Sequence, residues 1–552
     1  MQKPTDAMQP ALGSSGRTSP TVVDEEKGKT LDDIYVDFEP GDRRNPATWS
    51  PRRKWLVTFV ASYFTALTGA TASAYSMGFP SMMRELRCTE EQAALGISMF
   101  CLGFALVPLL TSAFSEEFGR RPLYVVCTVV FTAMYVVQAT ANNIQTVIAA
   151  RFVCGAFGST GATMVGGTVA DVWAPAERGL PMAVYSLFAI AGTGTGPIVA
   201  GWIEMSLGWR WIQWFHTIAG GLCIVLTVAV LQETRTGIML TRKAKALRTQ
   251  TGDARYRARA EDARGPLRSL LWVSATRPLI LLLTEPTVLV FSLWIAFAWG
   301  IMYSMFESIL PVFEGLYGFN QGQAGLTFAG MTVGALLGFA TNLYQESLYR
   351  KHFPARGPEA RLFAACGAAL LFPAGMFIYA WGARAAIPWI VPVLGVTVRL
   401  LPYFFINIVF VHCIYPPLSC SLLPRFPCPL RFLSRLVLFY HRVDGTTHAR
   451  RQLFMWATFI MYLAVFTYLA DCYGPYASSA LAGQSLLRNL MGTAFPLFTP
   501  PMYARLGIHW ASTLFGCVAL AMVPIPYVLL LLGPKIRARS RFASTVVHQP
   551  SL

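Results

Sequence analysis

Two short charged segments, half a chain apart, hold the residues whose types and spacing best suit electrostatic switching. The first charged segment covers residues 115–122 and the second covers residues 345–351. In each, a glutamate is followed four and five residues later by two cations, within a brief polar break between long apolar runs. The residues concerned are Glu116, Gly119, Arg120 and Arg121 in the first segment and Glu346, Arg350 and Lys351 in the second. Such repetition is typical of a membrane protein built from two related halves.

One aspartate in each half ends a later apolar run. Asp171 precedes Val-Trp and Asp471 precedes Cys-Tyr, at equivalent places in the two halves. We expect Asp171 to pair with Arg120 or Arg121, because charges at membrane depth are weakly screened. Together with Arg178, such pairs would act as a latch between helix ends. The alternative is that these charges only fix the orientation of the chain in the membrane.

Arg151 and Glu307 lie inside or at the edge of apolar runs, where an ionisable residue is costly and is a functional candidate. Glu307 follows Tyr303 and Phe306, whose rings could stack on a planar molecule or hold a cation. Desolvation favours the neutral carboxyl group, so Glu307 could exchange protons near neutral pH. Arg488 is its candidate partner, or alternatively a residue with a structural role. The alternatives are an Arg151 side chain that reaches the interface, and a Glu307 carboxylate satisfied there.

Long apolar runs position all of these residues. Of the 552 residues, 54% are hydrophobic and only 13% are charged, and the mean hydropathy is +0.47. A stretch of about 20 apolar residues spans a bilayer as a helix. Twelve such runs are predicted, at about 55–78, 92–113, 122–141, 146–169, 180–202, 209–231, 286–312, 323–345, 361–381, 387–398 continuing at 454–470, 476–500 and 509–532. The sequence therefore predicts an all-α polytopic membrane protein with both termini on one side.

Lys and Arg are concentrated on one set of loops, and the positive-inside rule predicts that these loops are cytoplasmic. Both termini are therefore expected in the cytoplasm. The predicted order is a disordered tail (1–54), a first six-helix half (55–232), a basic cytoplasmic linker near the inner leaflet (233–285), a second six-helix half (286–533) and a C-terminal tail (534–552).

One stretch, residues 398–453, interrupts the tenth apolar run. Glu116 and Asp171 are 55 residues apart, whereas Glu346 and Asp471 are 125 residues apart, so the second half is longer where the first needs no such length. We hypothesise that residues 398–453 are translated from an unspliced intron or reflect an incorrect gene model. The alternatives are a genuine extra loop, an additional membrane-associated segment, or an insertion that leaves the protein inactive.

Motifs and charge exclude several other functions. The net charge of +17 reflects cytoplasmic loops, because no basic stripe with interleaved aromatics stands outside the apolar body to bind nucleic acid. No CxxC or HExxH pattern indicates a metal site, and Cys413, Cys420, Cys428 and His412 are too loosely spaced to form one. No GxxxxGK[ST] loop is present to bind ATP. We expect no cofactor.

The fifth apolar run is rich in small residues and contains a proline. The residues of interest are Gly192, Gly194, Gly196, Pro197 and Gly201. Small residues let helices approach closely, and a proline introduces a kink. Ordinary helix packing would explain the same composition.

These motifs together resemble the major facilitator superfamily, and within it the fungal drug:proton antiporters with twelve spanning helices. The resemblance covers about residues 45–535, apart from the interrupting stretch, and rests on a set of markers. They are Asn45-Pro46-Ala47-Thr48-Trp49-Ser50 before Arg53-Lys54-Trp55, the first charged segment, Arg151, Gly196-Pro197, Glu307 to Pro311, and Tyr468 to Asp471. The resemblance implies two six-helix halves around a central cavity that opens to each side in turn.

The resemblance also implies roles for particular residues. The first charged segment would form the cytoplasmic gate, with Glu116 where the family usually has Asp, while the second segment lacks the glycine. Arg151 would tune a carboxyl group in proton coupling. The fifth-run motif, in which Ala200 replaces a usual glycine, would indicate antiport. From their own chemistry, rather than from the resemblance, we place Tyr303, Phe306, Glu307 and Arg488 in the substrate cavity.

The function expected from this resemblance is proton-coupled export of small organic compounds, such as drugs, toxins, polyamines or secondary metabolites. We expect a monomer in the plasma membrane, or alternatively in the vacuolar membrane, whose partners are its substrate, protons and the lipid bilayer. Two other functions remain open at this point. One is nutrient uptake by proton symport, and the other is a non-transporting receptor on the same scaffold.

Overall fold

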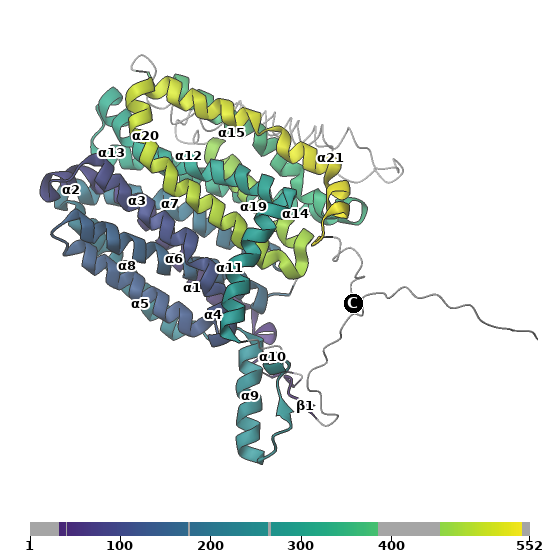
Figure 1. Cartoon of the computed structure of the whole chain (residues 1–552). Coiled ribbons are helices and arrows are strands. Elements are labelled where there is room, and N and C mark those ends of the chain that lie inside the picture. The colour runs from purple at the N-terminus through teal and green to yellow at the C-terminus, as the bar shows by residue number, and fades with distance from the viewer. Residues whose placement is uncertain are drawn as a thin grey trace, which may run out of the picture.

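The computed structural model describes residues 33–39, 41–42, 44–174, 177–262, 266–384 and 453–543. This part of the chain is almost entirely helical, and long helices lie side by side in a bundle (Figure 1). Its β-structure is a pair of two-residue strands outside the bundle. The predicted all-α membrane fold is confirmed.

The first half contains the helices that precede the linker. They are α1 (Pro51–Ala74), α2 (Phe79–Leu86), α3 (Glu90–Leu106), α4 (Pro108–Phe118), α5 (Arg120–Ala139), α6 (Ile144–Val172), α7 (Gly179–Leu207) and α8 (Trp209–Val230). Thr89 and Asn143 begin α3 and α6, because each side chain accepts a hydrogen bond from a backbone N–H of the first turn. Gly119 and Gly208 separate consecutive helices at positive φ values of 95° and 82°.

The second half follows the linker. Its helices are α12 (Pro286–Tyr317), α13 (Gln321–Leu326), α14 (Ala329–Arg356), α15 (Phe363–Gly382), α19 (Leu453–Tyr473), α20 (Ala477–Ala521) and α21 (Pro524–Arg539). A 3-10 helix, η3 (Gly357–Leu362), separates α14 from α15. The first part of the predicted tenth span, and all of residues 398–452, lie outside the described residues.

The described helices contain ten apolar stretches long enough to cross a membrane, and two of them hold two crossings each. These two stretches, Gln321–Gly382 and Ala477–Arg539, are 62 and 63 residues long, whereas a single crossing takes about 20 residues. The first divides at η3, and the second divides at Gly507, whose φ of 74° and ψ of 164° are not helical. Twelve crossings result, six in each half, as the apolar runs predicted.

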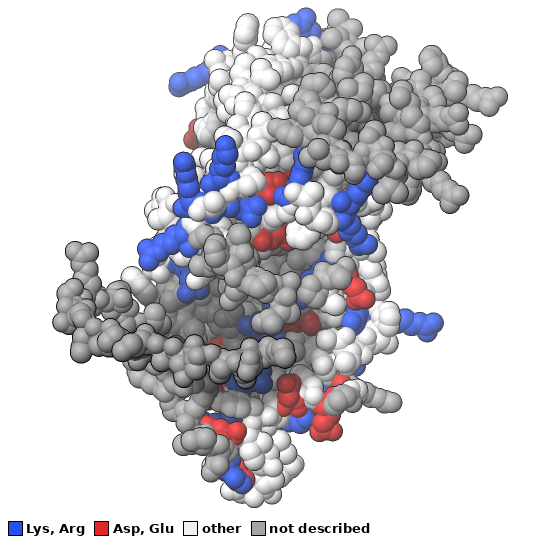
Figure 2. Space-filling model, turned by 90° about the vertical axis from the view of Figure 1, so that its right-hand side faces the viewer, with Lys and Arg blue, Asp and Glu red and all other residues white. Residues whose placement is uncertain are grey.

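The two faces of the bundle differ in their elements and charge. One face carries the linker, the start of α1 and the ends of α14 and α21, and is called the linker side below (Figure 1). The other face, called the far side, carries α2, α13 and the break in α20. Figure 2 shows the linker side, where Lys and Arg side chains gather over the described surface with Asp and Glu among them.

The linker is folded and holds part of the N-terminal tail. It contains α9 (Thr236–Thr251), β2 (Tyr256–Arg257), α10 (Arg259–Asp262) and α11 (Leu267–Thr284). Strand β1 (Ile34–Tyr35) pairs with β2 in parallel, and Val36 is buried with Ala244 and Ala258. Asp33 and Glu39 of the tail form ion pairs with Arg257 and Lys243 of the linker. Residues 33–39 of the predicted disordered tail therefore have a defined partner, while residues 1–32 lie outside the described part.

The break at Gly507 gives a testable consequence. Its φ and ψ fall in a region that essentially only glycine adopts, so Gly507→Ala should cost about 1–3 kcal/mol of stability. We expect a lower midpoint of thermal unfolding for the full chain in detergent. Gly221→Ala is the matched control, because Gly221 is helical and a Cβ added there would meet nothing within 4 Å. Equal midpoints for the two variants would show that the break does not depend on this backbone conformation.

Candidate functional site

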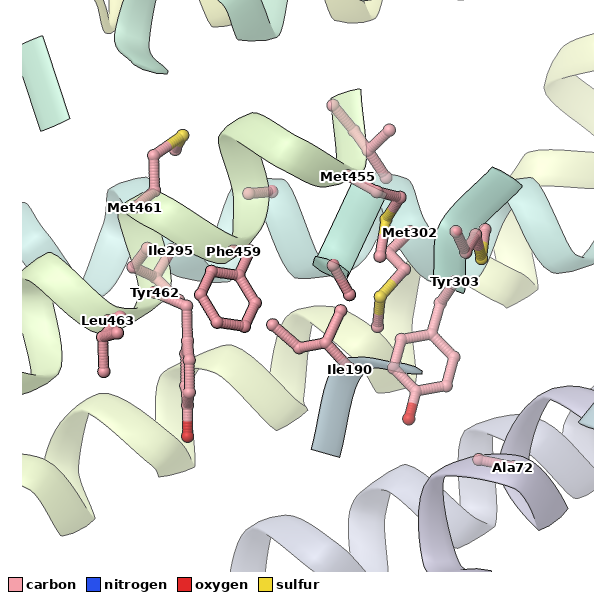
Figure 3. Close-up of a cluster of buried hydrophobic side chains, with 14 of the residues drawn as sticks. Ala72, Ile190, Ile295, Met302, Tyr303, Met455, Phe459, Met461, Tyr462 and Leu463 are labelled. Atoms are coloured by element: carbon pink, nitrogen blue, oxygen red, sulfur yellow. The ribbon is translucent and has the colours of Figure 1, made fainter. Parts of the chain in front are cut away.

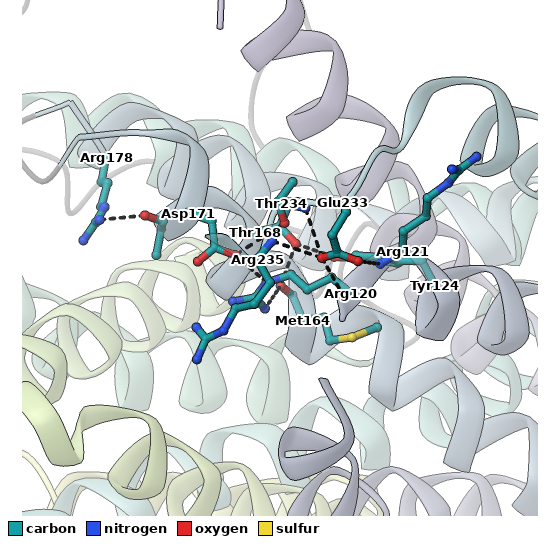
Figure 4. Close-up of polar contacts among 11 residues, drawn as sticks. Arg120, Arg121, Tyr124, Met164, Thr168, Asp171, Arg178, Glu233, Thr234 and Arg235 are labelled. Atoms are coloured by element: carbon teal, nitrogen blue, oxygen red, sulfur yellow. Dashed lines mark hydrogen bonds and ion pairs between the residues drawn. The ribbon is translucent and has the colours of Figure 1, made fainter. Parts of the chain in front are cut away.

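An ion pair joins the start of α5 to the end of α6 on the linker side. The Nε of Arg120 lies 2.6 Å from Oδ2 of Asp171, and both side chains are nearly buried. A second guanidinium nitrogen of Arg120 donates to the carbonyl of Met164 at 3.3 Å. Gly167 permits this approach, because a Cβ there would collide with the guanidinium group. Of the two arginines considered from the sequence, Arg120 is therefore the partner of Asp171 (Figure 4).

Glu233 caps the same helix start and was missed by the sequence analysis. Its Oε1 accepts the backbone N–H of Arg120 at 3.0 Å, and its Oε2 accepts that of Arg121 at 3.3 Å. A carboxylate at a helix N-terminus satisfies free N–H groups and the helix dipole. Gly119 leaves the space for it, because a Cβ at that position would collide with Glu233. Arg120, Asp171 and Glu233 are called the N-half charge cluster below.

The other residues of the first charged segment have separate places. A side-chain nitrogen of Arg121 lies 3.4 Å from the carbonyl of Val228. Arg178 donates to the carbonyls of Trp173 at 2.8 Å and Ala170 at 2.6 Å, and so caps the end of α6. Glu116 belongs to α4, but its side chain lies outside the described residues.

The second half contains a corresponding cluster around a different arginine. Arg361 of η3 lies 2.6 Å from Glu346 and 3.0 Å from Asp471. Its guanidinium group stacks 3.4 Å from the ring centre of Tyr349, whose hydroxyl donates to Asp471 at 2.9 Å. Glu346, Arg361 and Asp471 are called the C-half charge cluster below.

Arg350 and Lys351, chosen from the sequence as the cations of this segment, lie at the edge of the cluster, where Arg350 makes only a long ion pair with Glu346. Arg350 is 69% exposed with its Nε 3.9 Å from Glu346, and Lys351 is exposed. The cause is the missing glycine: in the first half Gly119 ends α4 directly before Arg120, whereas α14 continues to Arg356. The chain turns only at Gly357, where φ is 63°, and Arg361 follows this turn. In the sequence, Arg361 could have been found as an arginine that follows shortly after Gly357, the first glycine beyond Glu346.

The two halves meet at the C-half charge cluster. A Cβ added to Gly179, at the start of α7, would lie 3.1 Å from Oε1 of Glu346 in α14. The N-terminus of a helix from one half therefore faces a carboxylate of the other, which is a favourable arrangement. A cleft of about 290 Å³ lies beside this contact, lined by Gly179, Leu180 and residues of α14 that include Glu346 and Arg350.

The small residues of α7 face two different neighbours. Cβ atoms added to Gly192 and Gly196 would collide with backbone of α1 at Ala66 and Ala70. A Cβ at Gly194 would lie 2.6 Å from Thr332 Oγ1 in the second half. About two turns further along, a Cβ at Gly201 would lie 2.7 Å from the Gln321 carbonyl, also in the second half, and Pro197 lies within the helix between them. The motif packs α7 against its own half and against the other half at once.

Arg151 is fully enclosed in the first half. Its side chain is 1% exposed, and its NH1 donates to the carbonyl of Thr71 at 3.2 Å. The guanidinium carbon lies 3.7 Å from the ring centre of Tyr75 and 5.5 Å from that of Phe100. Its Nε has no hydrogen-bond partner in the described part of the chain. The side chain therefore does not reach out to the membrane interface.

Glu307 lies in α12 beside the aromatic residues predicted to accompany it. The rings of Tyr303 and Phe306 are 5.1 Å apart. Both carboxylate oxygens of Glu307 are buried, and neither has a hydrogen-bond partner among the described residues. Arg488 is therefore not its partner, since that arginine lies level with Trp299, about two helical turns away along α12.

Apolar side chains fill the interior between these groups. Figure 3 shows Ile190 of α7, Met302 and Tyr303 of α12 and Met455 and Phe459 of α19 gathered in one cluster. Methionine side chains adapt their shape to irregular partners. No group of three or more His, Cys, Asp or Glu that could hold a metal ion occurs among the described residues, and Cys413, Cys420, Cys428 and His412 lie outside them.

In the part of the chain that the structure describes, twelve crossings in two halves, with paired charges on one face and buried ionisable atoms without hydrogen-bond partners within, are typical of a secondary transporter. The family model described as "Major Facilitator Superfamily" matches residues 58–425. The chain belongs to this superfamily.

The curated relatives of the chain are fungal transporters. The "MFS-type efflux pump MFS2" of Trichophyton rubrum is 32% identical over 94% of this chain and 78% of its own length. The "Major facilitator superfamily multidrug transporter mdrA" of Aspergillus fumigatus is 32% identical over 94% of this chain and 77% of its own. The "MFS-type transporter oryN" of Aspergillus oryzae is 30% identical over 96% of both chains.

Solved structures share the fold at low identity. The proton:xylose symporter XylE, bound to 6-bromo-6-deoxy-D-glucose, has a TM-score of 0.55 and 14% identity, covering 87% of this chain and 97% of its own. The human organic anion transporter MFSD10 has a TM-score of 0.52 and 16% identity, covering 87% of this chain and all of its own. These similarities establish the fold alone.

The C-half charge cluster predicts unequal effects for its two candidate arginines. Arg361→Gln should lower stability by about 1–3 kcal/mol, because Glu346 and Asp471 lose the cation they share. Arg350→Gln, the control, should change it by less than about 0.5 kcal/mol, since this side chain is largely exposed. Thermal unfolding of the full chain in detergent measures both. If Arg350→Gln lowered stability more than Arg361→Gln, Arg350 would be the main cation of the cluster, as the sequence predicted.

Proposed function

We propose that the chain exports small organic compounds in exchange for protons, opening a central site first to one side of the membrane and then to the other. The observation that carries this proposal is the buried Glu307 carboxyl group without a hydrogen-bond partner among the described residues. A buried, unpartnered carboxylate is costly, whereas the protonated group costs far less. Binding and loss of a proton at Glu307 would therefore shift the balance between conformations.

Arg151 would assist this coupling. Its charge is held by aromatic rings and one carbonyl rather than by a carboxylate. A buried cation favours the ionised form of a nearby carboxyl group, and its effect changes as the helices around it move. This is the role that the family resemblance implies for the residue.

The charge clusters would latch the linker side. The N-half charge cluster joins helix ends within one half, and Glu346 faces the start of α7 across the two halves. The cross-half contact would break when the halves rock apart, while Arg120–Asp171 would keep its own half rigid. We propose that the linker side is cytoplasmic, because its described surface is rich in Lys and Arg.

The relatives support export as the direction of transport. They carry names such as "efflux pump" and "multidrug transporter", and they align with nearly the whole chain. Drugs, toxins, polyamines and secondary metabolites are the proposed substrates. We propose a monomer in the plasma membrane, with the vacuolar membrane as the alternative.

Nutrient uptake is the second candidate, since a proton:xylose symporter shares the fold. Sugar recognition needs many polar partners, because each buried hydroxyl must find a hydrogen bond. The interior cluster in Figure 3 consists instead mainly of apolar side chains such as Met302, Ile190 and Phe459, which favours lipophilic compounds. A non-transporting receptor is disfavoured by the buried ionisable groups, which such a receptor would not need.

A growth-inhibition panel in a pump-deficient yeast, with and without residues 398–453 in the expressed chain, would identify a substrate. Export of that substrate by wild type should increase as the outside pH falls. Glu307→Gln should lower export by about tenfold or more and abolish this pH dependence. Glu314→Gln, on the same helix and only half-buried, is the matched control and should behave as wild type. Normal export with normal pH dependence in Glu307→Gln would remove Glu307 from the mechanism.

A further inference from the structure

Arg488 is a buried cation whose charge the described protein leaves uncompensated. The side chain is 8% exposed, and its NH2 donates to Ser485 Oγ at 3.2 Å. Its Nε has no hydrogen-bond partner in the described part of the chain. The guanidinium carbon lies 4.6 Å from the ring centre of Trp299 and 5.4 Å from that of Tyr462. Aromatic rings offset only part of the cost of burying an arginine, so the site has capacity for an anion.

The region around Arg488 carries an excess of positive charge. In the first half, the Arg151 guanidinium carbon lies 5.5 Å from the ring centre of Phe100, which precedes Cys101. In the second half, Glu307 lies one turn beyond Tyr303 on α12. Gly492 lies one helical turn beyond Arg488, and a Cβ added there would lie 3.1 Å from Tyr303 and 3.5 Å from Cys101. Two arginines and one carboxyl group leave a net charge of +1 when Glu307 is ionised and +2 when it is protonated.

The surroundings of Arg488 restrict the kind of anion. Trp299 and Tyr303 are one turn apart on α12, opposite Arg488 and Gly492 on α20. Beyond them lie the apolar side chains of Figure 3, including Met302, which adjoins Tyr303. A monovalent anion with a flat apolar body would balance the charge and fill such surroundings. With Glu307 ionised the net charge is +1, so a phosphate or a dicarboxylate would leave an uncompensated negative charge in the site.

Arg488 also lies close to the first half, so a ligand bound to it could contact both halves. A Cβ added to Gly492, one turn beyond Arg488 on α20, would lie 3.5 Å from the Sγ of Cys101 in α3 of the first half. A ligand on Arg488 would therefore be sensitive to the relative position of the halves, as a transported substrate must be.

We infer that the substrates are amphipathic organic anions, whose single carboxylate binds the guanidinium group of Arg488 while their aromatic part lies against Trp299, Tyr303 and Tyr462. Arginine suits this role because its planar fork matches a carboxylate with two parallel hydrogen bonds. The inference rests on the proposed transport function and narrows its substrates to organic anions among the drugs, toxins and secondary metabolites, which excludes the cationic polyamines.

Three probes of one shape and different charge test the inference: 1-naphthoate, the neutral 1-naphthamide and the cation 1-naphthylmethylammonium. Binding to the full chain in detergent, near neutral pH, is followed by quenching of tryptophan fluorescence, with Trp299 beside the site. We expect naphthoate to bind wild type at least about tenfold more tightly than the other two probes. Equal affinities, or tighter binding of the cation, would overturn the inference, and this comparison needs no variant.

Variants then assign the anion to Arg488. Arg488→Gln should weaken naphthoate binding by about 10- to 100-fold without weakening amide binding, and Arg488→Lys should retain part of the preference. Arg505→Gln, the same change at an exposed position of α20, is the control and should bind as wild type. Thermal unfolding checks that each variant is folded. Unchanged naphthoate binding in Arg488→Gln would overturn the assignment to this residue.

The transport arm separates this inference from the proposed function. Naphthoate flux is measured in proteoliposomes with an imposed pH gradient. Naphthoate that binds with the expected preference but is not moved by the proton gradient would refute proton-coupled export and leave the anion site standing. Proton-driven transport of the amide or the cation, with no binding of naphthoate, would refute the anion site and leave transport standing.

Discussion

The cost of placing a charge in hydrocarbon sorts the ionisable residues of this chain. Where the helices end at the linker side, the charges are paired: Arg120 with Asp171, and Arg361 with Glu346 and Asp471. Deeper in the bundle, Arg151, Arg488 and Glu307 keep buried atoms without hydrogen-bond partners among the described groups. The paired charges fix the ends of helices, whereas the unpaired ones leave interactions free for a proton or a ligand.

Glycines decide where the helices can come together around these charges. Gly119 admits the carboxylate of Glu233, Gly167 admits the Arg120 guanidinium group, and Gly179 faces Glu346 across the two halves. In α7, glycines spaced four residues apart approach α1, and glycines spaced seven apart approach the second half. One helix therefore belongs to the rigid packing of its own half and to the contact that must change when the halves move.

The apolar runs predicted the fold well because crossing a bilayer demands a helix of about 20 apolar residues, and such a run can be recognised in the sequence without knowing the rest of the fold. Candidate site residues were predictable one at a time, since an isolated charge in an apolar run is visible. Their partners were not. Arg350 and Lys351 have the right spacing, yet α14 continues past them and carries them into solvent, and Arg361 becomes the shared cation. Glu233 was missed because its partners are backbone N–H groups, which sequence spacing does not display.

The sequence by itself determined that this is a two-half membrane protein with charges at the helix ends and a few charges within, because hydrophobic length and repetition are local properties of the chain. Only the tertiary structure decided which charged side chains pair. Their pairing depends on where a glycine ends each helix and on which face of the neighbouring helix the side chain then reaches. Arg488 illustrates the difference: the sequence offered it as a partner for Glu307, and the packing of α20 on α12 and α19 instead holds it against Trp299 and Tyr462, free to take an anion.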